Sequence, residues 1–423
     1  MGKEFFMSKS VIEVLRERGF IHQESNPEGL QKILNKGPIT CYAGFDPTAA
    51  SLHIGSLVPI MALLHMQRAG HRVIAIVGGA TALIGDPSGK TEMRSVMTEE
   101  QLAKNLAGIR QNLSQYLDFS DNKALLLNNY DWLKPLNYID FLRDIGRHFF
   151  VNRMITQDSV KLRMERAKEG GEGLSFLEFN YSILQAFDFH HLAEHHHCLL
   201  QLGGSDQWGN ITAGIDLARR LSQKNLYGVT FPLLTTASGE KMGKTAKGAV
   251  WLNGEMCFPY DFYQFWRNVV DNDVIRFLKL FTLLSLEEIE KLSKLQGEEL
   301  NEAKKILAFE VTQMAHGEEK AKQAVAATVQ LRENSEGDDS LIPTFRLPLS
   351  ELQTGIPACI LFERTGLCKS KSEAKRLLQQ KGGYLNETVL EDPHFLINTT
   401  HLQNQILTLR SGKKKFLRIV PES

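Results

Sequence analysis

The sequence predicts an α/β fold in which a parallel β-sheet carries helices on both faces. Two observations favour this class. Residues 39–45 form a short apolar, β-prone run, and Val73–Val77 is the continuous apolar run expected of a strand buried on both faces. A helical pattern from Leu57 to Ala69 lies between them. A strand, a helix and a second strand joined by short connections form the repeating unit of a parallel sheet.

The first strand leads through Asp46-Pro47-Thr48 to a helix that begins near Leu57. A helix N-terminus offers free backbone N–H groups and partial positive charge, which suits a phosphate. Thr48 and His53 add neutral donors, and Gly55 lets a ligand approach the backbone closely. An ordinary connecting loop with a chance histidine is the competing interpretation.

The loop from Gly78 to Ser95 follows the second strand and is rich in glycine. Its glycine spacing is one residue too short for a P-loop and a proline removes a backbone donor, so we expect no Walker-type loop. Asp86, Lys90 and Arg94 nevertheless lie past a strand's carboxyl end, where open α/β sheets bind ligands. A solvated loop is the alternative.

A helical insertion is expected at about residues 130–170, after a helix at Gln101–Leu117 and a strand at Ala124–Leu127. Its two predicted helices, Tyr138–Phe149 and Asn152–Lys168, carry many large apolar side chains. We interpret these as an exposed apolar face that forms a subunit interface, with core packing as the alternative.

The next segment, Leu174–Ala193, is predicted to be one helix on which Tyr181, Gln185 and Asp188 share a face. A ligand with an ammonium at one end and a hydroxyl at the other would satisfy all three side chains, whereas a solvent-facing polar stripe would need no ligand. The histidines that end this helix include a pair with helical spacing, but no carboxylate or cysteine completes a set, so no metal site is expected.

Two further strand-to-loop turns carry polar residues. After a strand at Cys198–Leu202, the turn GGSDQWGN holds Asp206, and a carboxylate at such a turn typically binds ribose hydroxyls. After a strand at Val229–Leu234, Lys241 and Lys244 lie three residues apart in KMGKT. Two such lysines can neutralise a polyphosphate, although a solvated basic loop is the alternative.

The rest of the chain divides by composition into a helical domain (251–333), an acidic linker (334–348) and a small α+β domain (349–423). From residue 351 onward the chain has eleven Lys or Arg against seven Asp or Glu. The surplus lies on Lys369–Lys381, predicted as one helix, and on Lys413, Lys414 and Lys415, which suits an RNA backbone. A solvated charged surface is the alternative.

The composition excludes several classes of protein. With 423 residues and zero formal net charge, two or three domains are expected, and any nucleic-acid binding must come from a local basic surface. The five cysteines show neither zinc spacing nor CxxC pairing, and no long apolar run occurs, so we expect a cytoplasmic chain without a disulfide framework or membrane span. Met7 is an alternative start to Met1.

Taken in order, YAGFDPTAASLHIGS, VGGATALIGDPSGK, NYSILQAFDF, QLGGSDQWGN and KMGKT resemble the motifs of bacterial-type tyrosyl-tRNA synthetases, a family of class I aminoacyl-tRNA synthetases. The resemblance covers nearly the whole chain. It implies a Rossmann-like catalytic domain (1–250), a helical domain and a C-terminal RNA-binding domain like that of a small-subunit ribosomal protein.

The resemblance also implies roles for single residues. It assigns ATP binding to His53, Gly55 and the loop of Lys241, Lys244 and Thr245. It gives Thr48 a phosphate contact. One clear departure is Ser56, which replaces the last histidine of the HIGH motif and is expected to make a weaker or different contact with the ribose. The remaining implied site residues are Tyr42 and Asp188 for the substrate phenol, Asp86, Tyr181 and Gln185 around its ammonium, Asp206 for the ribose, and Gly44, Gly204 and Gln207 along the cleft.

The implied reaction joins tyrosine to ATP as tyrosyl-adenylate and then passes the tyrosyl group to the 3′ end of tRNA(Tyr). Mg²⁺ is expected to arrive with ATP rather than in a permanent protein site, and a homodimer is expected. Two alternatives stay open: a tryptophanyl-tRNA synthetase, which shares the chemistry, and an RNA-binding relative that has lost catalysis. Tyr42, Asp188 and the basic C-terminal domain argue against the first, and the intact His53 and lysines argue against the second.

Overall fold

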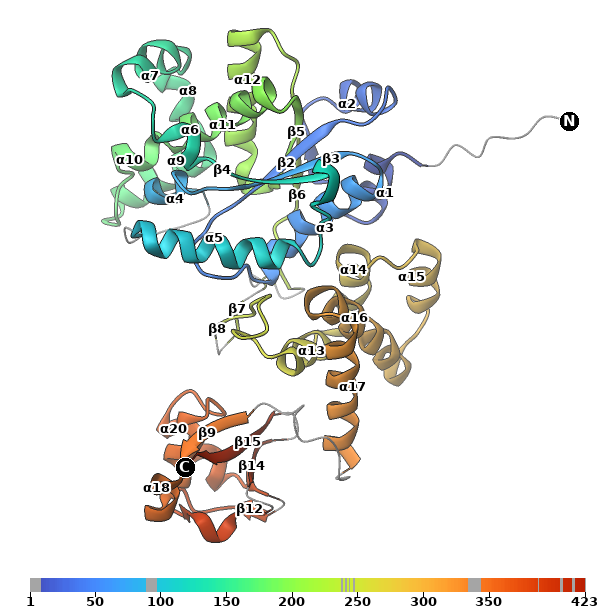
Figure 1. Cartoon of the computed structure of the whole chain (residues 1–423), viewed down its shortest axis with the longest axis vertical. Helices are drawn as coiled ribbons and strands as arrows, with labels where there is room; N and C mark the ends of the chain where they lie inside the picture. The colour runs from blue at the N-terminus through green and yellow to red at the C-terminus, as the bar shows by residue number, and fades with distance from the viewer. Residues whose placement is uncertain are drawn as a thin grey trace, which may run out of the picture.

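A computed structural model of the chain describes residues 9–88, 97–236, 239, 242, 244–245, 248–333, 344–386, 388–403, 406–412 and 415–422. Its first part holds a six-stranded sheet in the order β1-β6-β5-β2-β3-β4 (Figure 1). β2 to β6 run parallel and β1 pairs with β6 as an antiparallel edge, so the predicted parallel sheet is confirmed. The strands are β1 Gln23–Glu24, β2 Thr40–Phe45, β3 Arg72–Val77, β4 Ala124–Asn128, β5 Cys198–Gly204 and β6 Tyr227–Phe231.

The two faces of the sheet bury alternate residues of each strand. In β2, Cys41 and Ala43 join the core formed with α1 (Val11–Glu17) and α3 (Leu57–Arg68). Tyr42 lies in the opposite core, which contains residues of α11 (Tyr181–His195) and α12 (Trp208–Ser222). The period of two along a strand therefore gives each face its own hydrophobic layer. Other helices around the sheet are α2 Pro27–Leu34, α4 Thr81–Ile84 and α5 Glu99–Leu113.

The order of the strands reverses between β2 and β5. α3 carries the chain from β2 to β3, whereas α12 carries it from β5 to β6 in the other direction. The connections therefore diverge and leave a crevice at the carboxyl ends of these two neighbouring strands, which is where such sheets bind ligands.

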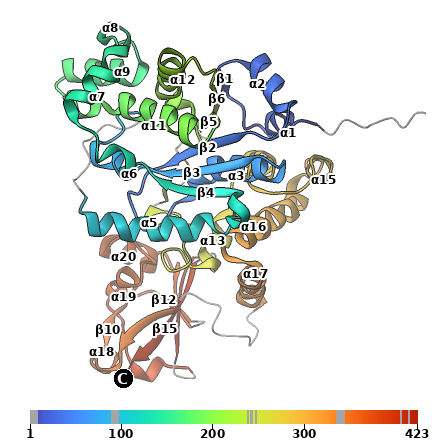
Figure 2. The same cartoon turned by 45° about the horizontal axis from the view of Figure 1, so that its top comes forward.

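The helical insertion is more broken than the sequence predicts. In both views it lies on the opposite side of the sheet from α1 (Figure 2). The predicted helix Tyr138–Phe149 ends at Asp144 and continues as a 3-10 turn at Gly146, because glycine weakens a helix interior. The insertion helices are α6 Tyr130–Leu133, α7 Tyr138–Asp144, α8 Val151–Met154, α9 Asp158–Lys168 and α10 Phe176–Phe179.

Two other segments that the sequence predicts as single helices are each divided into two helices, so these predictions are wrong. Asn152–Lys168 divides into α8 and α9, and the Thr156 hydroxyl between them donates to the Arg153 carbonyl at 2.7 Å. Leu174–Ala193 divides into α10 and α11 at Asn180, whose Nδ2 donates to the Phe176 carbonyl at 2.6 Å. In both places a short polar side chain competes for backbone groups of the helix.

The strand predicted at Val229–Leu234 also stops early, since β6 ends at Phe231. The next residue is Pro232, which has no N–H to donate to a sheet. Residues 232–234 instead line the crevice beside β5.

A helical part follows the sheet and shares its larger core, in which α14 packs against α3. Arg18, at the end of α1, donates from Nη1 to the carbonyls of Lys279 (2.9 Å) and Thr282 (3.0 Å) at the C-terminal end of α14. These bonds tie the helical part to the sheet and satisfy carbonyls that a helix end leaves unpaired. The helices are α13 Pro259–Arg267, α14 Asp271–Phe281, α15 Leu286–Leu292, α16 Leu300–His316 and α17 Glu318–Glu333.

The C-terminal residues have a separate hydrophobic core, whose buried members lie between Leu347 and Ile419. They form a five-stranded sheet in the order β12-β11-β14-β15-β9. The basic helix predicted at Lys369–Lys381 is the shorter α20, which starts where the Ser370 side chain caps it. The elements are β9 Thr344–Pro348, β11 Gly383–Leu385, β12 Thr388–Leu390, β14 Leu407–Ser411, β15 Lys415–Glu422, α18 Leu349–Thr354, α19 Ala358–Arg364 and α20 Lys371–Gln379, with a two-stranded pair β10 Ile356–Pro357 and β13 Leu396–Ile397.

No described helix is long and apolar enough to cross a membrane. Within the described ranges there is also no group of three His, Cys, Asp or Glu placed to hold a metal ion. Of the predicted RNA-contacting lysines, Lys413 and Lys414 lie outside the described residues, and Lys415 begins β15.

Candidate active site

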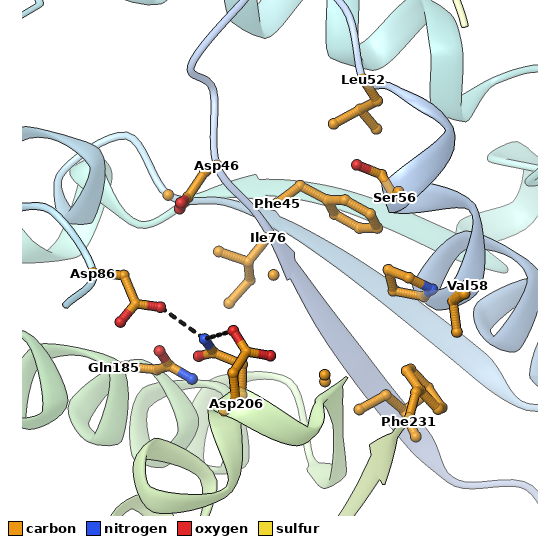
Figure 3. Close-up of a pocket in the computed structure, with 18 of the residues that line it drawn as sticks. Phe45, Asp46, Leu52, Ser56, Val58, Ile76, Asp86, Gln185, Asp206 and Phe231 are labelled. Atoms are coloured by element: carbon orange, nitrogen blue, oxygen red, sulfur yellow. Dashed lines mark hydrogen bonds between the residues drawn. The ribbon is translucent and has the colours of Figure 1, made fainter. Parts of the chain in front are cut away.

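A cavity of about 360 Å³ opens in the crevice between β2 and β5. Predicted site residues from five separate segments of the chain meet in its wall. Figure 3 shows Asp86 and Gln185 on one side of the cavity, Ser56 and Val58 on the other, and Ile76 between them. The predicted residues that line it are Tyr42, Gly44, Thr48, His53, Gly55, Ser56, Asp86, Tyr181, Gln185, Asp188, Gly204, Asp206 and Gln207.

Asp188 is the most completely buried carboxylate of the cavity, and two donors hold it in place. Trp132 Nε1 donates to Oδ1 at 2.7 Å and Asn129 Nδ2 donates to Oδ2 at 2.9 Å. Burial raises the pKa of the Asp188 carboxyl to about 7, against the opposing effect of these two hydrogen bonds. The two donors use one lone pair on each oxygen, and a carboxylate has others with which to accept a further hydrogen bond.

Tyr42 and Gln201 lie beside Asp188 on neighbouring strands, where they are register partners. Both side chains are at most 4% exposed, and neither Tyr42 Oη nor Gln201 Oε1 has a hydrogen-bond partner among the described residues. Burial, with the nearby Asp188, raises the pKa of the Tyr42 phenol, so this hydroxyl keeps its proton. All three residues line the cavity, where the Tyr42 hydroxyl can donate and the Asp188 carboxylate can accept, so these two groups suit a ligand hydroxyl.

A second polar network joins the loop after β3 to the turn after β5. Gln207 Nε2 donates to Asp86 at 2.7 Å and to Asp206 at 3.2 Å, as the dashed lines in Figure 3 show. The Ser88 N–H donates to the other oxygen of Asp86 at 2.8 Å. Burial raises the pKa of Asp86 to about 6, a shift that the hydrogen bonds from Ser88 and Gln207 oppose, so the carboxyl is ionised at neutral pH and suits an ammonium group.

The loop that carries Thr48 is held from behind by one face of α5. Asn105 Nδ2 donates to the Pro47 carbonyl at 2.7 Å, and Asn112 Oδ1 accepts from the Leu52 N–H at 2.8 Å. Between them, Gly108 lies so close to the loop that an added Cβ would be 1.9 Å from the Ala50 carbonyl oxygen. Two buried amides and one glycine of a helix therefore fix the course of this loop.

His53 lies where this loop meets the segment that follows the lysine loop. Its Nδ1 accepts the Gly55 N–H at 3.0 Å, and its ring contacts Trp251 edge to face. On either side of His53 the main chains pair, since the Ile54 N–H donates to the Val250 carbonyl at 3.0 Å and the Leu252 N–H donates to the Leu52 carbonyl at 2.8 Å. We refer to these two bonds as the backbone stitch.

The lysine loop itself is described only in part. Lys241 lies outside the described residues, and Lys244-Thr245 form the short strand β7, which pairs with β8 (Gly248–Ala249), without a description of their side chains. Before the loop, the Thr235 carbonyl accepts a hydrogen bond of 2.8 Å from Arg276 Nη2 of α14. The predicted contacts of the two lysines therefore stay predictions.

Comparisons with known proteins agree with this geometry. Residues 34–332 match the family model described as class I tRNA synthetases of the W and Y type. A protein of Syntrophus aciditrophicus named tyrosine–tRNA ligase is 51% identical, over 98% of this chain and 99% of the relative. One of Desulfosudis oleivorans with the same name is 50% identical over 97% of this chain and 99% of the relative. The chain belongs to the class I tyrosyl-tRNA synthetase family.

Solved structures place the synthetase in the same fold. A C-terminally truncated mitochondrial tyrosyl-tRNA synthetase of Aspergillus nidulans superposes with a TM-score of 0.69 and 31% identity, over 77% of this chain and 95% of that one. A tryptophanyl-tRNA synthetase of Encephalitozoon cuniculi reaches 0.55 at 16% identity, over 78% of this chain and 89% of that one, which shows the shared fold alone. The predicted fold class is thus confirmed, and the tryptophanyl alternative is not favoured.

Several residues of the synthetase site were not foreseen from the sequence. Asn129 and Trp132 precede Asp188 by more than fifty residues, and Gln201 occupies a strand whose pattern indicates only burial. Asn105 and Asn112 belong to a helix whose composition is polar and suggests a solvated surface, yet both are at most 4% exposed. The spacing of Asn105 and Asn112, seven residues apart on one helix, places both on the same face, and this spacing could have indicated their shared role.

Proposed function

We propose that this synthetase activates L-tyrosine with ATP and transfers the tyrosyl group to the 3′ end of tRNA(Tyr). The observation that carries this proposal is the buried Asp188, held by Trp132 and Asn129 beside the Tyr42 hydroxyl, which has no hydrogen-bond partner in the part of the chain that the structure describes. A site that pairs a ligand hydroxyl rejects an analogue lacking it, because its own polar groups would stay unpaired; tyrosyl-tRNA synthetases are themselves the established example of this effect, so its size is not a result of this structure. Relatives of about 50% identity over nearly the whole chain carry the same activity in their names.

The cavity offers separate positions for the two ends of the amino acid. With the phenol at Asp188, the ammonium would lie near Asp86, Tyr181 and Gln185, which line the same cavity. The carboxylate of tyrosine then attacks the α-phosphorus of ATP, the bond to pyrophosphate breaks, and pyrophosphate leaves with the negative charge. The protein forms no covalent bond, so the rate enhancement comes from positioning and from stabilising charge.

The nucleotide end of the cavity contains groups suited to each part of ATP. Asp206, on a glycine turn, suits the ribose hydroxyls, with Gly44, Gly55 and Gly204 allowing close approach. Thr48 and His53, which line the cavity with Ser56, are proposed as neutral donors for phosphate, and Ser56 is proposed to contact the ribose more weakly than, or differently from, the motif's histidine. Lys241, Lys244 and Thr245 are proposed to stabilise the leaving pyrophosphate, and Mg²⁺ is proposed to arrive bound to ATP.

The tRNA is proposed to bind the C-terminal domain through its basic residues. Lys413, Lys414 and Lys415 are consecutive in the sequence shortly after β14 (Leu407–Ser411), and on that strand the Arg410 guanidinium lies 3.6 Å from the centroid of the Tyr384 ring. A flat cation over an aromatic ring beside a lysine run supports contact with an RNA backbone and its bases.

A homodimer through the helical insertion is also proposed. Ile139, Phe150 and Val151 are 67%, 50% and 62% exposed, which is unusual for side chains of this size so close together in a chain. Phe149, by contrast, packs into the insertion's own cluster. A monomer in sedimentation at micromolar concentration, or a dimer unaffected by Phe150→Asp, would contradict this assembly.

We propose that the enzyme works in the cytoplasm, because protein synthesis takes place there. The five cysteines, which are free thiols, support this location.

ATP–pyrophosphate exchange with a panel of amino acids tests the central proposal. Exchange should depend on tyrosine and remain near background with phenylalanine and tryptophan. Exchange stimulated best by tryptophan, or by no amino acid, would overturn the proposal in favour of one of the two alternatives.

A further inference from the structure

His191 lies directly behind the indole that holds the buried carboxylate. The rings of Trp132 and His191 are stacked, with centroids 4.5 Å apart and planes inclined by 13°. Trp132 Nε1 in turn donates to Asp188 at 2.7 Å. We propose that His191 is a positioning residue for recognition of the substrate hydroxyl, which acts by fixing the plane of the Trp132 indole. This inference rests on the proposed function and adds a specificity determinant to it.

The arrangement works because one helix holds the indole at two points. Asp188 and His191 are three residues apart on α11, so they face the same side of that helix. Asp188 binds the edge of the indole through its N–H, and His191 covers one of its faces. A hydrogen bond alone leaves the ring free to tilt about the N–H direction, whereas a stacked partner defines the plane as well.

The need for such support follows from the short helix that carries Trp132. α6 contains only the four residues Tyr130–Leu133, and its N-cap residue makes no side-chain capping bond. Short helices are marginal by themselves and depend on tertiary contacts for their order. The stack supplies one such contact from α11, the same helix whose carboxylate the indole must meet.

A second histidine contacts His191 at a tilt of 41°, and His191 itself stays uncharged. The centroids of His191 and His195 are 4.3 Å apart, one helical turn along α11. Burial, together with the neighbouring His195 and His196, lowers the pKa of His191 to about 4, so the ring is neutral at physiological pH. A neutral imidazole lies on the indole without bringing a positive charge toward Asp188, so it orients the donor and leaves the electrostatics of the carboxylate unchanged.

The experiment compares three substitutions of His191 in the full-length protein by tyrosine- and phenylalanine-dependent ATP–pyrophosphate exchange. His191→Ala and His191→Leu remove the flat ring, and His191→Leu keeps apolar volume in case the smaller side chain fails to fold. Both should raise KM for tyrosine about two- to tenfold and lower the preference for tyrosine over phenylalanine by the same factor, the size expected for one aromatic pair. KM for ATP should be unchanged. His191→Phe, which retains a ring, should stay within about twofold of the natural chain.

His190→Ala is the matched control, because His190 is adjacent on the same helix and its Nδ1 lies 3.9 Å from Glu194 rather than on the indole. It should change neither KM. The inference fails if His191→Leu retains full preference for tyrosine, if KM for ATP rises as much as KM for tyrosine, or if His191→Phe is as impaired as His191→Leu. Failure of the proposed function would look different, since the unsubstituted chain itself would then not exchange pyrophosphate with tyrosine.

Discussion

Trp132→Phe removes one hydrogen-bond donor from Asp188 and keeps an aromatic ring in the same place. The lost bond, from Trp132 Nε1 to Asp188 Oδ1, measures 2.7 Å and ends on a carboxylate that is 4% exposed. A hydrogen bond to a charged group contributes about 1.5–3 kcal/mol to the ionised form, so without it a smaller fraction of Asp188 is ionised at neutral pH and tyrosine binding should weaken by roughly 10- to 100-fold. The same bond lowers the pKa of Asp188, which should therefore rise above its value of about 7 in the variant.

The assay is tyrosine-dependent ATP–pyrophosphate exchange between about pH 6 and 9, run in parallel with phenylalanine. We expect kcat/KM for tyrosine to fall by the factor above at neutral pH and to recover in part at the alkaline end of this range. Because phenylalanine offers no hydroxyl, its rate should change little, so the preference for tyrosine should fall. KM for ATP should stay the same, since Asp188 and Trp132 lie at the phenol end of the cavity.

Trp266→Phe is the control for the chemical change itself. Trp266 is fully buried in the helical part, and its Nε1 has no hydrogen-bond partner among the described residues. The substitution should alter stability without altering amino-acid preference. The reasoning is refuted if Trp132→Phe keeps the natural preference for tyrosine, or if both substitutions reduce that preference equally.

Four further results are expected. Tyrosine should bind best when Asp188 is ionised and can accept the phenol hydrogen, so the affinity for tyrosine should be full above about pH 8. Below the Asp188 pKa of about 7 this affinity should fall by up to about tenfold for each pH unit, and a flat binding profile would contradict this. Gly108→Ala should destabilise the protein by about 1–3 kcal/mol in urea unfolding and raise KM for ATP, because the new Cβ would lie 1.9 Å from the Ala50 carbonyl oxygen; an unchanged unfolding midpoint would show that the loop yields freely. Lys244→Ala should slow adenylate formation in single-turnover experiments by about tenfold or more while tyrosine affinity stays the same, the behaviour of a contact made mainly in the transition state, and the reverse outcome would remove Lys244 from the mechanism. A chain ending at residue 340 should still form tyrosyl-adenylate but charge tRNA very poorly, since the C-terminal core is separate; charging at nearly the full-length rate would contradict the role given to that domain.

Local pattern was sufficient to predict the sheet and most of the cavity wall. Apolar runs indicated the parallel strands, and the carboxyl ends of such strands must meet at one edge, so polar residues after β2, β3 and β5 had to converge. The spacing of Tyr181, Gln185 and Asp188 predicted one shared face, and all three line the cavity. That prediction is confirmed although α11 begins later than the predicted helix, because the break at Asn180 precedes all three residues.

What pattern could not predict depends on contacts between distant segments. Nothing near Asn129 or Trp132 in the sequence indicates that Asp188 will accept their hydrogen bonds, because the pairing exists only once the insertion folds back on α11. The helix breaks have a similar cause. Asn180 has an acceptable place in a helix by periodicity, but its side chain binds the Phe176 carbonyl one turn earlier, and α10 ends with Asn180 as its C-cap.

The backbone stitch has a consequence for how this protein can diverge in sequence. Its two hydrogen bonds join main-chain atoms of Leu52 and Ile54 to those of Leu252 and Val250, so they specify no side chain. Mutation can exchange these four residues among apolar types while the geometry that sets His53 beside the end of the lysine loop is inherited unchanged. Arg276 differs, because its guanidinium must reach the Thr235 carbonyl. Position 276 should therefore change more slowly during evolution than position 235, where only the backbone carbonyl is used. The family can therefore vary the sequence of the loop, as KMGKT does here, while the attachment of its far end to the segment around His53 is preserved by the backbone alone.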